Sequence, residues 1–461
     1  MLFTSWPFAG FVVVVATIYY LPSLRRWQLP WLVAASLALY AWMVGPMFWL
    51  LVGCGALTAL VSWRVGAQPT VKARRAWAVA GVLGNLAALA CFKYGRLATG
   101  LLPQHSPVAG LLLLPIPAGI SFYTFHGISL IIDVWRGTWT PPRNGVRHLG
   151  GASLYLVFFP QLIAGPIVRA RDFLSQVGPK DAATIGWPVV ARAIITGAFL
   201  KLVVADHLAV LTVDLDASWI ITLPGLNLAG LVIAYAMQLF ADFAAYSSLA
   251  VGLAALFGFT LPRNFAFPYL SESIGEFWRR WHISLGAWLR DYLYIPLGGN
   301  KRSAARNAAN LLLTMTLAGL WHGAAWGYAV WGLWSGAGMV AERALGLDPS
   351  RSRWWGVRAL RVLGVFAFIN VGWLFFRLRS VTAAFTVLQA AAAHLAWPPN
   401  VFPLATIAWF SLPVIVYHAW GRLEERRADL AERLAMPLLG VLLAWTIVDA
   451  AAPVPFIYFQ F

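Results

Sequence analysis

One histidine lies in the middle of a strongly apolar segment of this sequence. His322 belongs to LLLTMTLAGLWHGAAWGYAVW, residues 311–331, and its neighbours there are apolar or small. An ionisable side chain is costly inside a lipid bilayer and marks a functional site by default. A neutral imidazole can take the proton from an attacking hydroxyl, although a histidine that only hydrogen-bonds a neighbouring helix fits the same pattern. We therefore predict His322 as a catalytic base.

Two further polar residues lie in apolar surroundings. His282, next to Trp281, is predicted as a second polar group of the same site, and a histidine satisfied at the membrane interface is the alternative. Asp242, in LFADFAAYSSLAVG, is predicted to orient a histidine or an arginine, and a hydrogen bond between helices is the alternative. No serine near His322 forms the Gly-x-Ser-x-Gly turn of an acyl-serine enzyme. This absence favours direct transfer to a bound hydroxyl.

A run of basic residues surrounds and follows His282. Guanidinium groups suit phosphate, so these residues could hold the phosphates of an acyl carrier such as coenzyme A. The alternative is a cytoplasmic loop beside anionic lipid, and this is the interpretation that we favour for any single residue. The run comprises Arg279, Arg280, Arg290, Lys301, Arg302 and Arg306. No Walker A, dinucleotide-binding or zinc motif appears, so we predict no metal site.

The composition is that of a protein that spans a membrane several times. Of 461 residues, 60% are hydrophobic and 11% are charged, whereas soluble domains carry about 25% charged residues. The net charge is +17, from 34 basic and 17 acidic residues. Basic residues gather in the cytoplasmic loops of membrane proteins, which explains the charge better than nucleic-acid binding does. Membrane lipid is therefore a predicted partner and nucleic acid is not.

Apolar runs long enough to cross a bilayer recur along the whole chain. A crossing helix needs about 20 apolar residues, and on that basis we predict an all-α protein with about 11 to 13 spans. The run 228–258 fits either one long span or two shorter ones. None of the hydrophilic stretches between the runs is long enough to fold alone. Residues 1–461 are therefore predicted to form a single membrane domain.

The stretch 260–306 differs from the others because it mixes aromatic residues with arginine. Its large apolar residues recur every three or four positions, which places them on one helical face. They are Trp278, Trp281, Leu285, Trp288 and Leu289. We predict a helix at the membrane interface with tryptophan anchors, capped at its start by Ser271 and ended by a turn at Gly298-Gly299-Asn300.

Several motifs resemble those of the membrane-bound O-acyltransferase (MBOAT) superfamily. The most specific are FWRRWHISLGAWLRDYLYIPLGGNK (277–301) and GLWHGAAW (319–326). The segments GISFYTFHGISLIIDVWRG (119–137), FFPQLIAGPIVRARDF (158–173), 238–270 and the terminal FIYFQF (456–461) follow the same order. The branch that looks nearest contains the integral-membrane subunit of bacterial alginate O-acetyltransferase. The resemblance covers most of the chain.

The resemblance implies a helical fold around a tunnel, with the family's invariant histidine at its narrow centre. That histidine matches His322, and a second histidine of this branch matches His282. The resemblance implies transfer of an acyl group from a cytosolic thioester, acetyl-CoA in this branch, to a hydroxyl on the other side of the membrane or to an exported partner protein. For this chain the membrane is predicted to be the bacterial inner membrane. No tightly bound cofactor is implied. A periplasmic esterase-like partner of the SGNH type then places the acetyl group on a polysaccharide.

The matching motifs also suggest residues that bind substrate. Those that we predict are Asp242, Tyr246, Trp281, Trp321, Arg279, Arg280, Asp291 and Asn300. One segment departs from the family, whose members usually read DFSGYSDMAIG where this chain reads DFAAYSSLAVG. Asp242 and Tyr246 are kept, but Ala245 replaces glycine and Ser248 replaces aspartate. The departure leaves the acceptor polymer open.

Two other functions are weighed against the acetyltransferase. The first is transfer of D-alanine from a carrier protein to a cell-envelope polymer, which is the activity of a sister branch. The second is a transporter or lipid flippase without acyl chemistry. Inverted repeats with broken helices would support a transporter, and the sequence shows no such repeat.

Overall fold

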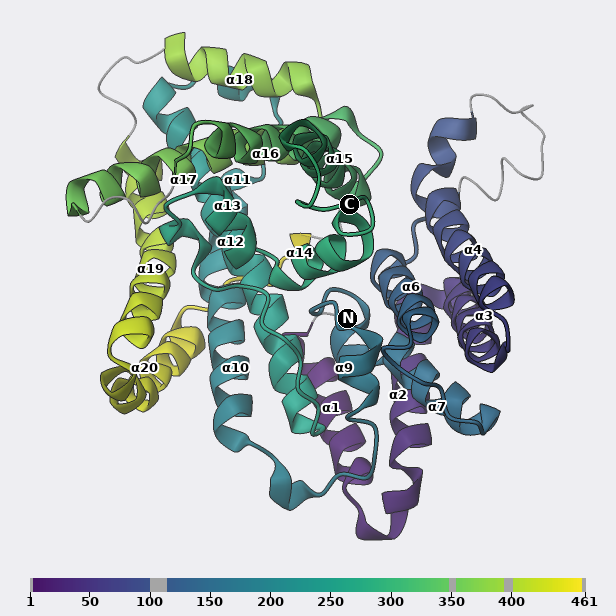
Figure 1. The fold of residues 1–461 in the computed structure, drawn as a ribbon. Helices are drawn as coiled ribbons and strands as arrows, with labels where there is room; N and C mark the ends of the chain where they lie inside the picture. The colour runs from purple at the N-terminus through teal and green to yellow at the C-terminus, as the bar shows by residue number, and fades with distance from the viewer. Residues whose placement is uncertain (1–2, 100–113, 348–353, 394–400, 458–461) are drawn as a thin grey trace. The chain divides into compact units, whose positions relative to one another are not determined.

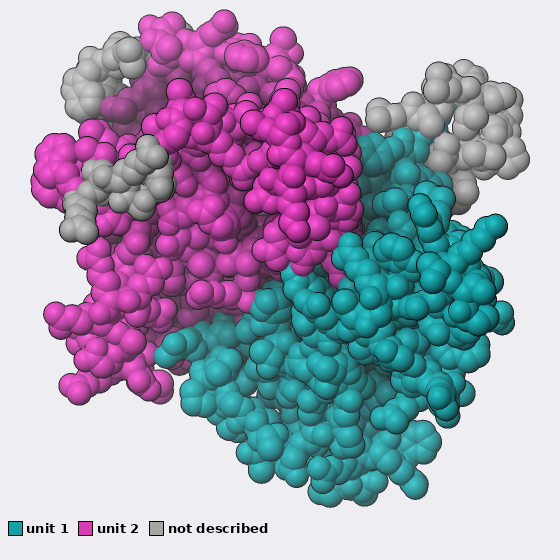
Figure 2. Space-filling model, in the orientation of Figure 1, with its two compact units in different colours: residues 1–194, 249–262 teal, residues 195–248, 263–461 magenta. Residues whose placement is uncertain are grey.

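The fold is built from α-helices. The computed structural model describes residues 3–99, 114–347, 354–393 and 401–457, and these residues form helices, turns and no β-strand (Figure 1). The prediction of an all-α protein is therefore confirmed. The chain divides into two compact units, the first made of residues 1–194 and 249–262 and the second of residues 195–248 and 263–461 (Figure 2). That the whole chain acts as one membrane domain stays a prediction.

Within the described parts of the chain, seven helical segments are long and apolar enough to cross a bilayer. They are Pro22–Ala67, Val71–Gly95, Trp187–Thr212, Gly225–Leu256, Trp355–Leu378, Pro403–Arg426 and Ala428–Val448. Two shorter apolar helices, Trp6–Tyr19 and Val381–Ala393, come in addition to these. The protein is therefore a multi-pass membrane protein. Seven is a count by length and composition, and the 11 to 13 spans predicted above include shorter apolar runs.

Unit 1 is a set of helices joined by buried polar contacts. Its helices are α1 (Trp6–Tyr19), α2 (Gln28–Val44), α3 (Phe48–Ala67), α4 (Val71–Ala98), α6 (Ile120–Arg136), α7 (Gly145–Val157), α8 (Phe159–Leu162) and α9 (Ala170–Leu174), with most of α10 (Trp187–Phe199). The Asn85 side-chain amide on α4 donates to the Thr58 hydroxyl on α3 at 3.2 Å. On α7, His148 Nε2 lies 3.0 Å from the Ser62 hydroxyl and 3.0 Å from the Ala59 carbonyl oxygen. Such contacts give these polar side chains hydrogen-bond partners, which the hydrocarbon chains of lipid cannot provide.

Unit 2 holds the helices that carry the predicted site. After α10 the chain passes through a π-helical turn, η5 (Leu200–Ala205), into α11 (Asp206–Thr212). The remaining helices are α12 (Gly225–Leu256), α13 (Ile274–Arg280), α14 (Ile283–Leu289), α15 (Ala304–His322), α16 (Trp326–Ala344), α17 (Trp355–Leu378), α18 (Val381–Ala393), α19 (Val401–Arg426) and α20 (Ala428–Val448). The run 228–258 is thus one long helix, α12, whose last residues belong to unit 1.

The stretch 260–306 forms two short helices where the sequence predicted one. α13 begins with the Ser273 hydroxyl accepting the Glu276 N–H at 3.0 Å, so Ser273 and not Ser271 is its cap. The chain then breaks at His282 and continues as α14. Trp281 and Trp288 are only 3% and 8% exposed, so the prediction of a single interfacial helix anchored by tryptophan is wrong. Helical periodicity shows which face is apolar, not whether lipid or protein covers it.

The predicted turn at the end of this stretch is confirmed. Gly298 and Gly299 both have positive φ, at 111° and 53°, a backbone conformation that glycine adopts without steric cost. The side-chain amide of Asn310 on α15 donates to the carbonyl oxygens of Leu297 and Gly299, at 3.2 and 3.3 Å. This turn directs the chain into α15, the helix that ends at His322.

The helices α15 and α16 approach each other unusually closely. A methyl group on Gly319 of α15 would overlap the Tyr328 carbonyl oxygen of α16, and one on Gly332 of α16 would overlap the Met315 carbonyl oxygen of α15. Small residues let helix backbones come this near in a membrane. The contact fixes the end of α15, and with it the position of His322.

Replacing Gly319 with alanine should therefore destabilise the protein. Overpacking of this kind costs about 1–3 kcal/mol, which we expect to appear as a lower apparent melting temperature in detergent. Gly364→Ala on α17 is the matched control, because no atom lies within 4 Å of its added methyl group. Equal melting temperatures for the two variants would contradict the close approach.

Candidate active site

His322 is enclosed by aromatic rings from three helices of unit 2. It is the last residue of α15 and is 4% exposed. Its ring centroid lies 4.8 Å from that of Trp321, 5.2 Å from that of Trp331 on α16 and 5.0 Å from that of Phe376 on α17. The imidazole is therefore buried within the protein, as its apolar sequence context predicted, and does not face the surrounding lipid.

His282 lies close to the same aromatic cluster. It is 3% exposed, and its ring stands perpendicular to that of Phe243 on α12, with the centroids 4.6 Å apart. Its ring centroid is 6.4 Å from that of Trp321, so Trp321 neighbours both histidines. Within the described residues, neither nitrogen of the His282 ring has a hydrogen-bond partner. The structure thus brings His322, His282 and Trp321 together.

Burial keeps the His282 imidazole neutral. His282 lies outside the seven long apolar segments, and desolvation lowers the pKa of its ring to about 3. A neutral ring has one nitrogen that donates a hydrogen bond and one that accepts. At neutral pH the His282 side chain can therefore form hydrogen bonds with a hydroxyl group. It carries no positive charge that would attract a phosphate.

Trp281 forms part of the wall behind the two histidines. Its ring stacks on Phe277 of α13 at 5.6 Å and lies 4.8 Å from Trp373 of α17. Trp331 stacks on the same Trp373 ring at 5.6 Å. Trp373 therefore contacts both Trp281 and Trp331, and Trp331 in turn contacts His322. These rings form one aromatic wall behind Trp281 and His322.

Asp242 and Tyr246 of α12 contact other parts of the protein. One Asp242 carboxylate oxygen lies 2.8 Å from Lys201 Nζ, and the other accepts the Ile457 backbone N–H at 2.7 Å. The Tyr246 ring stacks on that of Phe456 at 4.2 Å. The contact between Asp242 and Lys201 is the predicted alternative, a hydrogen bond between helices, and its partner is a lysine and not a histidine or an arginine. Substrate binding by Asp242 and Tyr246 stays a prediction.

The four other predicted binding residues lie in contacts that do not involve the histidines. Arg280 pairs with Glu276 at 2.9 Å and with Glu425 at 3.2 Å. Asp291 accepts from Arg290 at 2.8 Å. Arg279 and Asn300 are exposed. The accessibility that the phosphates of an acyl carrier would need is found at Arg279 and Asn300 and at four other members of the basic run, Arg290, Lys301, Arg302 and Arg306. Phosphate binding by these residues stays a prediction.

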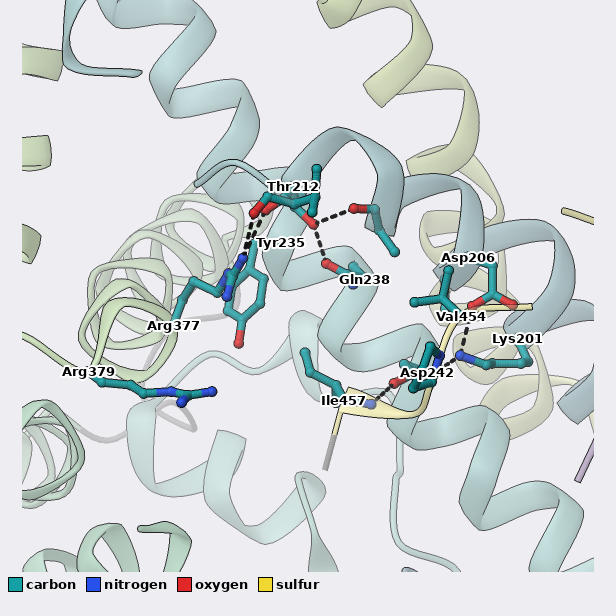
Figure 3. A pocket seen from close by; sticks show the side chains of 14 residues that line it. Lys201, Asp206, Thr212, Tyr235, Gln238, Asp242, Arg377, Arg379, Val454 and Ile457 are labelled. Carbon is teal, nitrogen blue, oxygen red and sulfur yellow. Dashed lines mark hydrogen bonds and ion pairs between the residues drawn. The ribbon is translucent and has the colours of Figure 1, made fainter. Parts of the chain in front are cut away.

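Sequence reasoning missed a buried lysine. Lys201 Nζ lies 2.7 Å from Asp206 and 2.8 Å from Asp242, and the three side chains are 6%, 1% and 3% exposed. Figure 3 shows these groups beside the C-terminal residues Val454 and Ile457. A cavity of about 110 Å³ adjoins them and is also lined by Tyr235, Gln238 and Arg377. The available signal was a lysine within a long apolar run, which marks a paired or functional charge.

The two imidazoles are the titratable groups that the structure brings together at this site. In the described part of the chain, no three His, Cys, Asp or Glu side chains gather as metal ligands would. A buried histidine among aromatic rings can remove a proton from a hydroxyl that reaches it.

Comparison with known proteins identifies the family. The family model for membrane-bound O-acyltransferases matches residues 152–385, which include His282 and His322. The chain is 37% identical over 415 residues to the protein named probable alginate O-acetylase of Pseudomonas aeruginosa, covering 88% of this chain and 77% of that one. It is 32% identical over 384 residues to the peptidoglycan O-acetyltransferase of Helicobacter pylori, covering 78% and 72%.

A third relative represents the sister branch. The chain is 30% identical over 291 residues to the teichoic acid D-alanyltransferase of Streptococcus thermophilus, covering 56% of this chain and 66% of that one. All three relatives carry the names of acyl-transferring enzymes, which favours an enzyme over a transporter without chemistry. The resemblance seen in the sequence motifs is confirmed, and the chain belongs to the membrane-bound O-acyltransferase family.

Proposed function

We propose that this O-acyltransferase moves an acetyl group from cytosolic acetyl-CoA across the bacterial inner membrane to hydroxyls of an exported or cell-surface polysaccharide. The observation that carries the proposal is His322, buried in an aromatic enclosure within the region that matches the family. The names of the alginate and peptidoglycan O-acetylating relatives supply the polysaccharide acceptor. Transfer is direct or passes through a periplasmic partner of the SGNH type.

The proposed reaction needs one base and one positioned hydroxyl. One nitrogen of the His322 ring takes the proton from the acceptor hydroxyl while the hydroxyl oxygen attacks the thioester carbonyl carbon. A new C–O bond forms, the C–S bond breaks, and the proton passes from the imidazolium to the departing thiolate. His282 supports this step by hydrogen-bonding a substrate hydroxyl, because its ring is neutral and lies close to Trp321.

A second candidate is transfer of D-alanine from a carrier protein, which the teichoic acid relatives support. Both candidates use a thioester donor and the same histidine, so they differ in the donor that the protein accepts. The longer match to the O-acetylating relatives favours acetyl-CoA, since it covers 88% of the chain against 56%.

The donor can be tested with purified protein in proteoliposomes. We expect radiolabelled acetyl-CoA to transfer its label to deacetylated polysaccharide, with or without an added SGNH-type partner, and to release CoA thiol. A carrier protein loaded with labelled D-alanine should give no transfer, and His322→Gln protein is the blank for both donors. Transfer from the carrier alone would replace the acetyl proposal with the second candidate. Absence of transfer from either donor, with the partner present, would contradict both.

A further inference from the structure

His282 has a backbone conformation that non-glycine residues rarely adopt. Its φ is 44° and its ψ is 53°, at the break between α13 and α14. Left-handed residues of this kind persist only when the surroundings hold them, and they cluster at functional sites. The side chain is buried, and both of its ring nitrogens have no hydrogen-bond partner within the described residues. Something else in the protein must therefore hold this turn.

Asn264 makes the contacts that fix the residues after His282. The Ile283 N–H donates to the Asn264 carbonyl oxygen at 2.9 Å, and the Ser284 N–H donates to Asn264 Oδ1 at 3.3 Å. The Ser284 hydroxyl donates to the same Oδ1 at 2.6 Å. The first amides of a helix need partners from outside it, and the His282 side chain does not cap α14. Asn264 therefore supplies the missing cap from 18 residues earlier in the chain.

Asn264 is itself held in place. It is 2% exposed, and its side-chain amide donates to the Ser247 hydroxyl on α12 at 3.0 Å. Two residues later, the Ala266 N–H donates to the Arg280 carbonyl oxygen at 3.0 Å. Hydrogen bonds from residues 264–266 thus lie on both sides of His282. One turn before Ser247, the Phe243 ring packs against the His282 ring, so α12 supports both the ring and its backbone.

We propose that Asn264 is a positioning residue, which holds His282 in its left-handed turn so that the unpartnered imidazole meets a hydroxyl of the acceptor substrate. The proposal rests on the proposed function, in which His282 contacts substrate. Asn264 itself touches neither substrate nor the reacting atoms. Its contribution is the fixed direction of the His282 side chain.

A double-mutant cycle tests this role, with acetyl-CoA as donor and polysaccharide as acceptor. Asn264→Ala should lower kcat/KM by about 10- to 100-fold, as expected for a misplaced active-site group. Asn264→Asp keeps the oxygen that accepts from Ser284 and should retain most of the activity. In a His282→Ala background, Asn264→Ala should cause no further loss, because residues that act through one group are not additive.

The outcomes separate this inference from the proposed function. Full activity in His282→Ala protein would exclude the substrate role of His282 itself. If His282→Ala protein keeps a reduced but measurable activity, and Asn264→Ala lowers it by the same factor as in the wild-type background, positioning is excluded and the proposed function stays intact.

A milder variant keeps the proposal testable if Asn264→Ala does not fold. Ser247→Ala removes only the group that fixes the Asn264 amide and should give a smaller loss in the same direction, again absent in the His282→Ala background. His282→Gly should restore the stability of Asn264→Ala protein, because glycine adopts the left-handed conformation without strain. The proposal would be overturned if Ser247→Ala caused no loss of activity and His282→Gly did not restore the stability of Asn264→Ala protein.

Discussion

Replacing His322 with glutamine should reduce acyl transfer by about 10²- to 10⁴-fold, the usual contribution of a general base. Glutamine keeps a polar side chain of similar length but cannot take up the proton of an attacking hydroxyl. The loss should appear in kcat, since the hydroxyl can still bind beside the aromatic wall. The measurement is the release of CoA thiol, followed with saturating acceptor.

His418→Gln is the matched control for this variant. His418 is also a buried histidine of unit 2, 2% exposed and 5.3 Å from the Tyr269 ring, and its Nδ1 lies 2.7 Å from the Val414 carbonyl oxygen. It should keep most of the activity at an equal apparent melting temperature. An active His322→Gln protein would remove His322 from the mechanism, and equal losses in both variants would indicate general damage to the fold.

Lys201→Met should be the most destabilising of the substitutions considered. It removes the cation that lies between Asp206 and Asp242 and leaves two buried carboxylates without compensation. Breaking a buried ion pair in this way costs about 3–5 kcal/mol. We expect a correspondingly lower free energy of unfolding, measured by denaturant titration in detergent.

Neutralising the carboxylates provides the control for this experiment. Protein with Lys201→Met, Asp206→Asn and Asp242→Asn carries no buried charge at these three positions and should regain much of the lost stability. Asparagine can still accept the Ile457 N–H that Asp242 accepts. If Lys201→Met alone unfolds like the wild type, or if the triple variant is no better than the single one, the ion cluster does not stabilise the fold.

The all-α, multi-pass fold of this protein could be predicted from its composition and its long apolar runs. Long apolar runs can only be helices in lipid, so the all-α, multi-pass fold follows from the residues. The burial of His322 also follows, because no charged residue lies near it in the segment 311–331. The family motifs placed His282 close to the same site, which spacing along the chain could not have shown.

The errors came from contacts between residues distant in sequence. The break at His282 depends on hydrogen bonds from Asn264, and no local pattern of apolar residues records them. The sequence left two kinds of contact open for Asp242 and did not identify its lysine partner, because Lys201 lies on another helix, 41 residues away. The tryptophans of α13 and α14 were assigned to the interface because lipid and protein bury the same side chains.

The π-helical turn η5 makes the ion cluster depend on the local winding of its helix. In a regular α-helix, residues five apart such as Lys201 and Asp206 stand about 140° apart around the axis. The backbone hydrogen bonds of a π-helical turn join residues five apart. This winding lets the Lys201 side chain lie next to that of Asp206. If residues 200–205 were wound as a conventional α-helix, this spacing would swing the Lys201 cation away from the Asp206 carboxylate. A substitution that removes the π-helical turn without shortening the chain would therefore also break this ion pair.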